Sequence, residues 1–119
     1  MSKILLVEDD DSLIKLYRDI LLDEGFEVIV AKTGQEGLTA AKAIPDLIIL
    51  DIMLPGGMNG FDVLEKLKKD DELKKIPVFV ITNLESEEKV AREIGAVDYA
   101  VKVHIDPHEL VDKIRKILH

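Results

Sequence analysis

Short apolar segments of this sequence end in residues whose side chains can do chemistry. These residues are Glu8, Asp9, Asp51, Thr82 and Lys102. Together they offer carboxylates, a hydroxyl and an ammonium group. Mg²⁺ takes oxygen ligands, and cationic side chains pair with phosphate oxygens, so the set suits a magnesium ion and a phosphoryl group. That chemistry requires these side chains to meet in the folded chain.

The apolar segments before these residues have the length and composition of strands buried on both faces. They are residues 3–7, 47–50, 78–81 and 99–101. Such strands are typical of parallel sheets covered by helices. Ligands bind these sheets outside the carboxyl ends of the strands. We therefore expect the polar residues to gather at one edge of a sheet.

Strand and helix patterns alternate along the chain. The predicted strands are 3–8, 26–31, 46–51, 77–82 and 98–101, and the predicted helices are 12–24, 34–43, 61–70, 86–94 and 107–118. Because connections between parallel strands are right-handed, we expect an α/β fold: a flavodoxin-like (βα)₅ doubly wound parallel sheet in the strand order 2-1-3-4-5. In this order the first strand lies beside the third, which brings Asp51 next to Glu8 and Asp9. We expect a single domain over residues 1–119.

The composition excludes several classes of protein. The chain has 119 residues, 47% of them hydrophobic, which is typical of a globular domain and not of a disordered chain. It contains no cysteine, which fits a reducing cytoplasm and excludes disulfides and thiolate metal sites. The formal net charge of −8 argues against direct nucleic-acid binding. The apolar segments are too short to cross a membrane, and acidic residues follow the first one at once, unlike a signal peptide.

Each polar residue also has an ordinary structural explanation. Glu8 and Asp9 fit a solvated turn before a helix, whose dipole favours acidic residues. Thr82 is a β-branched residue typical of strands, and Lys102 fits an exposed surface. Asp51 is harder to explain, because a charge that ends a buried strand is costly unless it is paired or used. Three neighbouring carboxylates would also repel one another unless a cation lay between them.

Four motifs, in this order, resemble the receiver domains of bacterial two-component response regulators. They are LVEDD at 6–10, LDIMLP at 50–55, VIT at 80–82 and GAVDYAVK at 95–102. The resemblance covers essentially the whole chain. In length the chain resembles the single-domain type that is similar to chemotaxis regulators.

The resemblance implies that Asp51 accepts a phosphoryl group from a histidine kinase or a histidine phosphotransfer protein. It further implies that Asp9 binds Mg²⁺ directly and Glu8 binds it through water, with Asp51 and the backbone carbonyl of Met53 completing the protein ligands. Lys102 would pair with the phosphoryl group. A metal ion and a lysine suit a loose phosphoryl-transfer transition state, which needs neutralised charge and aligned atoms.

The resemblance also implies a change of state after phosphorylation. Thr82 would move toward the phosphate, and Tyr99 would turn inward behind it. The surface made by the fourth helix, the fifth strand and the fifth helix would then report to a downstream protein. We expect a monomer or weak homodimer, and no enzymatic activity beyond self-catalysed phosphorylation and dephosphorylation.

Some residues depart from the family pattern or tune it. By the same resemblance, Met53 and Leu84 would flank the approach of hydrolytic water, and their apolar side chains predict slow loss of the phosphoryl group. Val103 stands where these domains usually have proline, which predicts a trans Lys102–Val103 bond and a rerouted loop. Compared with the usual family pattern, the loop after Asp51 is one residue longer, around Gly56–Gly57, and the segment after Thr82 is shorter. The three histidines are expected to face solvent.

Other functions remain open at this stage. A receiver fold that binds a partner without being phosphorylated is the main alternative. A dehalogenase-type phosphotransferase would have a second aspartate two residues after the nucleophile, where this chain has Met53. A nucleotide-binding module would have a glycine-rich loop after the first strand, where this chain has acidic residues.

Overall fold

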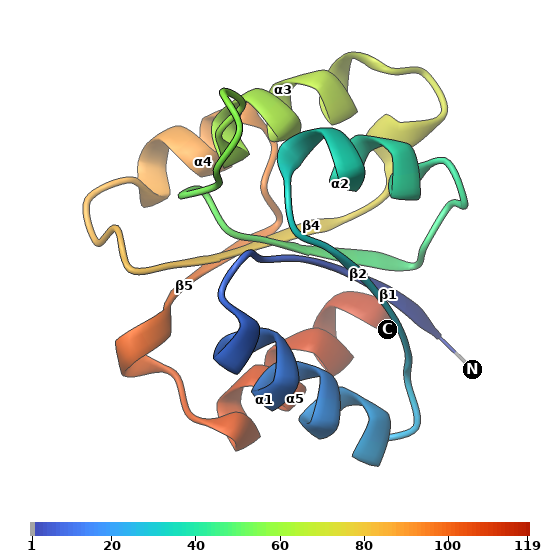
Figure 1. Cartoon of the computed structure of the whole chain (residues 1–119), viewed down its shortest axis with the longest axis vertical. Coiled ribbons are helices and arrows are strands. Elements are labelled where there is room, and N and C mark those ends of the chain that lie inside the picture. The colour runs from blue at the N-terminus through green and yellow to red at the C-terminus, as the bar shows by residue number, and fades with distance from the viewer. Residues whose placement is uncertain (1) are drawn as a thin grey trace.

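The computed structural model of the protein describes residues 2–119 and has a five-stranded parallel sheet between two layers of helices (Figure 1). The strands are β1 (Lys3–Val7), β2 (Glu27–Ala31), β3 (Leu47–Leu50), β4 (Val78–Thr82) and β5 (Asp98–Val101). Their order is β2-β1-β3-β4-β5, with every neighbouring pair parallel. The predicted flavodoxin-like order is confirmed. Met1, part of the predicted domain, lies outside the described residues.

Helices cover both faces of the sheet. They are α1 (Asp11–Asp23), α2 (Gly34–Ala41), α3 (Gly60–Lys69), α4 (Glu88–Ile94) and α5 (Pro107–Leu118), with short 3₁₀ helices η1 (Leu73–Lys75) and η2 (Lys102–His104). In Figure 1, α1 and α5 lie on one face, and α2, α3 and α4 lie on the other. Within the described chain, every helix is too short or too polar to span a bilayer.

The strands are apolar throughout because each packs against helices on both faces. In β1, Leu5 and Val7 pack with residues of α2, α3 and α4, whereas Ile4 and Leu6 pack with residues of α1 and α5. All four side chains are almost fully buried. Successive side chains of a strand point to opposite faces, so one short apolar segment serves two cores.

The helix boundaries differ from the predicted ones where capping differs. Helix α3 begins at Gly60 because the side chains of Asn59 and Asp62 form a reciprocal capping box with each other's backbone N–H groups. Helix α4 begins at Glu88 and not at Ser86, and the residue before it makes no side-chain capping bond. The predicted start of this helix at residue 86 was therefore wrong.

The segment after β5 contains Val103, from which a trans peptide bond was predicted. The Lys102–Val103 bond is trans, as predicted. The chain then makes the turn of η2, which was not predicted, and enters α5 at Pro107. The side chain of Asp106 accepts a hydrogen bond from the backbone N–H of Glu109 at 2.9 Å and caps α5.

Candidate functional site

The carboxyl ends of β1 and β3 bring three acidic residues together. Val7 and Leu50 are register partners in these neighbouring strands, so the residues that follow them, Glu8 and Asp51, leave the sheet side by side. Carboxylate oxygens of Glu8, Asp9 and Asp51 lie within 4.8 Å of one another. Glu8 and Asp51 are only 2% and 5% exposed, whereas Asp9 faces solvent.

Lys102 joins the two buried carboxylates. Its Nζ donates a hydrogen bond to Asp51 Oδ2 at 2.6 Å and another to the Glu8 carboxylate. Burial works to lower the pKa of the Lys102 ammonium, but the hydrogen bonds and charges of Asp51 and Glu8 outweigh burial and raise the pKa above its ordinary value. Lys102 therefore carries its charge into the site at neutral pH.

Backbone amides hold the other oxygens of these carboxylates. Glu8 Oε2 accepts from the N–H groups of Asp9 and Asp10 at 3.0 and 3.1 Å. Burial raises the pKa of Glu8, while the bonds from Lys102 and from the Asp10 backbone oppose that rise. Asp51 Oδ1 accepts from the N–H of Met53 at 3.0 Å. The carboxylate of Asp51 is thus oriented from both sides.

Thr82 lies at the carboxyl end of β4 with no hydrogen-bond partner for its hydroxyl. The residue is fully buried. Among the described residues, Thr82 Oγ1 is the one buried side-chain polar atom without a partner. A buried hydroxyl left unpaired costs about 1–3 kcal/mol, and such an atom calls for an explanation. The hydroxyl retains its full capacity to bond a group that enters the site.

Tyr99 is buried and linked to the segment that follows β4. Its side chain is packed in the core on the side of α2, α3 and α4. Its hydroxyl donates a hydrogen bond to the backbone carbonyl of Leu84. The side chain of Leu84 is half-buried against the same core, whereas the side chain of Met53 is 59% exposed. Both lie in the loops that leave the carboxyl ends of β3 and β4, where sequence reasoning expected them.

Several contacts of the site were not predicted from the sequence, and two of them involve the loops that follow β3 and β4. These two are the bond from the N–H of Met53 to Asp51 and the bond from Tyr99 to the carbonyl of Leu84. Both use a backbone group, and every residue except proline carries the same backbone donor and acceptor. No pattern of residue types could therefore have indicated them.

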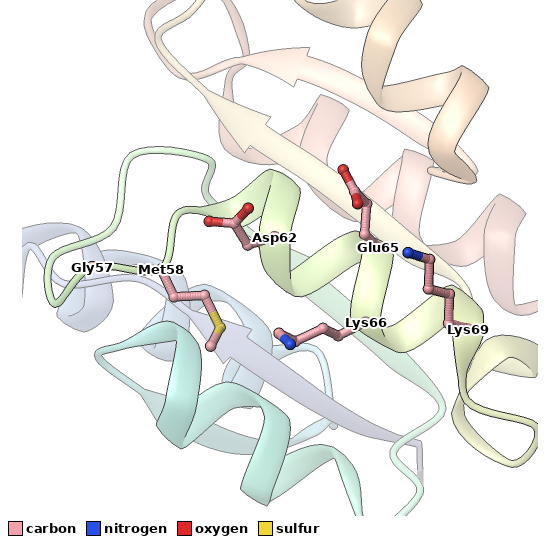
Figure 2. A pocket seen from close by; sticks show the side chains of 6 residues that line it. All are labelled: Gly57, Met58, Asp62, Glu65, Lys66 and Lys69. Atoms are coloured by element: carbon pink, nitrogen blue, oxygen red, sulfur yellow. The ribbon is translucent and has the colours of Figure 1, made fainter.

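The other polar features lie elsewhere. The three histidines are exposed, as predicted. A separate open hollow of about 360 Å³ is lined by Gly57, Met58, Asp62, Glu65, Lys66 and Lys69 (Figure 2). Its side chains come from α3 and the loop before it, and Asp62 is already committed to the capping box. No residue predicted for the site lines this hollow.

The acidic residues fit a magnesium ion in their chemistry. Every side-chain ligand that they offer is a carboxylate oxygen, which hard divalent cations prefer. The three carboxylates and the ammonium of Lys102 carry a formal charge of −3 + 1 = −2. A divalent cation would balance that charge. Glu8, Asp9 and Asp51 are therefore a suitable site for Mg²⁺.

Comparison with known proteins gives consistent similarities. The sequence profile of the response regulator receiver domain matches residues 4–115. The transcriptional regulatory protein CpxR of Escherichia coli strain K12 is 42% identical over 120 residues, which cover 99% of this chain and 50% of CpxR. The chain spans about half the length of the curated relatives that it matches.

Solved structures are similar over the full described fold. The BeF3-activated N-terminal receiver domain of RstA from Klebsiella pneumoniae has a TM-score of 0.90 and 31% identity, with 98% of each chain covered. A CheY-like response regulator receiver domain protein from Methanospirillum hungatei JF-1 has a TM-score of 0.90 and 33% identity, covering 99% of this chain and 94% of the other.

Proposed function

Because the chain belongs to the response regulator receiver domain family, we propose that it accepts a phosphoryl group on Asp51 and passes the signal to a downstream protein. Receiver domains are signalling modules that interact with histidine kinases and effectors, and phosphorylation and Mg²⁺ are general features of the family. The donor would be a histidine kinase or a histidine phosphotransfer protein. The dehalogenase and nucleotide-binding alternatives lose their support with the family assignment.

The observation that carries this proposal is that both oxygens of the Asp51 carboxylate accept hydrogen bonds. One of its oxygens is held by the N–H of Met53 and the other by Lys102. In the proposed step an Asp51 oxygen forms a bond to phosphorus while the bond from phosphorus to the donor's imidazole nitrogen breaks. The imidazole leaves with the bonding electron pair and takes up a proton. Asp51 then carries an acyl phosphate.

Lys102 supplies positive charge where the transition state needs it. Phosphoryl transfer passes through a loose transition state whose charge spreads over the phosphoryl oxygens. The ammonium already contacts Asp51, so it needs only a short movement to reach an oxygen of the incoming group. Asp9, Asp51 and the Met53 carbonyl would hold Mg²⁺, with Glu8 bound through water, and the ion would neutralise further phosphoryl charge.

The unpaired hydroxyl of Thr82 supports a role in output. We assign it as the group that bonds the phosphoryl oxygen after transfer. Movement of Thr82 would disturb the segment after β4, where Tyr99 bonds the Leu84 carbonyl. The surface of α4, β5 and α5 would then change shape and report phosphorylation to a partner.

The lifetime of the phosphoryl group is proposed to depend on Met53 and Leu84. Neither side chain can orient a hydrolytic water by a strong hydrogen bond, so slow self-dephosphorylation is expected. The measurement is phosphoryl decay in Met53→Asn, Leu84→Glu and the double variant at constant Mg²⁺. Faster decay in the variants supports this role, and unchanged or slower decay contradicts it.

We also propose residues 1–119 as one receiver domain that acts in the cytoplasm as a monomer or weak homodimer. One sheet with a core on each face supports a single unit. The net charge of −8 is unfavourable for direct contact with nucleic acid. Light scattering with and without a phosphodonor measures the oligomeric state.

The decisive experiment is intact mass spectrometry after treatment with acetyl phosphate and Mg²⁺. The parent protein should gain the mass of one phosphoryl group, and omission of Mg²⁺ should prevent the gain. Asp51→Asn should gain none. Full phosphorylation of Asp51→Asn would overturn the assignment, and an unmodified parent would point to a receiver fold that acts without phosphorylation.

A further inference from the structure

The loop between Asp51 and α3 is closed at its base by a contact that only glycine permits. The N–H of Gly60 donates to the carbonyl of Ile52 at 2.7 Å. A Cβ on Gly60 would lie 2.3 Å from the carbonyl oxygen of Asp51 and 2.5 Å from the Cα of Ile52. Both are backbone atoms, so no side-chain rotation can relieve the overlap. The backbone of Asp51 would have to move.

The tip of the same loop, unlike its base, makes no close contact that would exclude a side chain. Gly56 and Gly57 have φ values of +88° and +81°, and a Cβ at either would meet nothing within 4 Å. Figure 2 shows Gly57 on the loop and Asp62 in the first turn of α3. The base keeps its close backbone contact.

Other bonds hold the two ends of the loop. At the α3 end, the capping box joins Asn59 and Asp62 by two bonds of 3.0 Å. At the strand end, Ile52 is 4% exposed and packed in the core, and its carbonyl also accepts from the N–H of Leu54 at 3.1 Å. Gly60 therefore packs the first turn of α3 against the segment that directly follows β3.

We propose that Gly60 is a positioning residue for Asp51. Its contact sets the backbone of Asp51 and Ile52, and so sets the carboxylate of Asp51 between the N–H of Met53 and the ammonium of Lys102. The same contact sets the segment that carries the Met53 carbonyl. This inference rests on the proposed function, because positioning matters here for Mg²⁺ and for phosphoryl transfer.

The test compares Gly60→Ala with Gly57→Ala. Both change glycine to alanine in one loop, and Gly57→Ala loses stability through its positive φ without touching Asp51. Displacement of a reacting group by about 1 Å costs about 100-fold in rate. Gly60→Ala should therefore lower the initial rate of phosphorylation by acetyl phosphate at saturating Mg²⁺ about 100-fold. The rate of Gly57→Ala should stay within about twofold of the parent rate, which is the usual deviation when two sites act independently.

Mg²⁺ affinity is a second readout that needs no phosphoryl transfer. Titration with Mg²⁺, followed by backbone amide chemical shifts, should show weaker binding in Gly60→Ala and parent-like binding in Gly57→Ala. Urea unfolding confirms that both variants are folded under the assay conditions. A Gly60→Ala protein whose rate and Mg²⁺ affinity both lie within about twofold of Gly57→Ala would overturn the positioning role.

A second pair of variants keeps the inference testable if Gly60→Ala does not fold. Asn59→Ala removes the cap of α3. Thr33→Ala removes the cap of α2, because the Thr33 side chain accepts a hydrogen bond from the N–H of Glu36 at 3.1 Å. Both cost similar stability. Only Asn59→Ala should weaken Mg²⁺ binding severalfold, and equal effects would overturn the inference. A parent that binds Mg²⁺ but gains no phosphoryl group would refute the proposed function alone, since the titrations would still decide the role of Gly60.

Discussion

The edge of the sheet that carries Asp51 and the segment around α4 are held in opposite ways. At the edge, the ammonium of Lys102 bridges Glu8 and Asp51, and all three side chains are less than 10% exposed. At α4, Arg92 bonds Glu88 at 2.8 Å and Asp98 at 3.0 Å, but its side chain is 45% exposed. One region is held by buried charges and the other by charges in water.

This difference in burial implies a difference in rigidity between the two regions. Removal of one partner from a buried ion pair costs about 3–5 kcal/mol, whereas an exposed pair contributes about 0–1 kcal/mol. Helix α4 has seven residues, only Ala91 of them buried, and it lacks a side-chain cap. Segments with few buried contacts open at low free energy. The Asp51 edge is therefore held more firmly than the α4 segment.

Among these substitutions, removal of the Lys102 ammonium should have the largest effect on the free energy of unfolding. Lys102→Met leaves two buried carboxylates without their cation and should lower the free energy of unfolding by about 3 kcal/mol without Mg²⁺. Lys113→Met is the matched control, because the Lys113 side chain is 37% exposed and pairs with Asp98 at 3.2 Å. Urea unfolding measures both. Equal losses would show that burial does not distinguish the two regions.

Thr82 lies between the two regions, and its substitution should separate stability from signalling. Thr82→Val replaces an unpaired buried hydroxyl by a methyl group and should raise the free energy of unfolding by about 1 kcal/mol. Phosphorylation should persist, with smaller chemical-shift changes over residues 86–117. Thr39→Val, at an exposed position of α2, is the stability control. Parent-like shift changes in Thr82→Val would contradict the output role.

Asp9 should show that the carboxylates repel one another without a cation. Asp9→Asn removes one of three neighbouring charges and should raise stability by up to about 1 kcal/mol in the absence of Mg²⁺. The parent should gain about 2.7 kcal/mol when Mg²⁺ is present at 100 times its dissociation constant, and Asp9→Asn much less at the same concentration. Asp19→Asn, on the exposed surface of α1, should respond to Mg²⁺ like the parent. Thermal unfolding with and without Mg²⁺ gives the comparison, and equal shifts in Asp9→Asn would contradict a site here.

Arg92 should give the smallest effect. Arg92→Gln removes one exposed ion pair within α4 and another that joins α4 to β5, and should cost about 0.5 kcal/mol at low salt. The difference from the parent should shrink at 1 M salt, where screening is strong. Urea midpoints at the two salt concentrations measure this. A loss above about 2 kcal/mol that persists in salt would mean that α4 is held as firmly as the Asp51 edge.

Sequence reasoning found the polar groups and the topology because both have strong local signals. Glu8, Asp51 and Thr82 each follow an apolar segment, and the strand order places the first two side by side. It misplaced the start of α4, where no capping side chain marks a boundary. It also missed η2, since a turn of three residues has no periodic pattern.

The sequence by itself determined the fold class, the strand order and which residues meet at the sheet edge. Alternation of apolar segments, the handedness of their connections and the number of strands favour this arrangement. Only the tertiary structure decided that Lys102 bridges Glu8 and Asp51, that Thr82 has no partner and that Gly60 touches the backbone of Asp51. These features depend on ångström-scale distances between segments far apart in the chain, and such distances follow from packing and not from residue type.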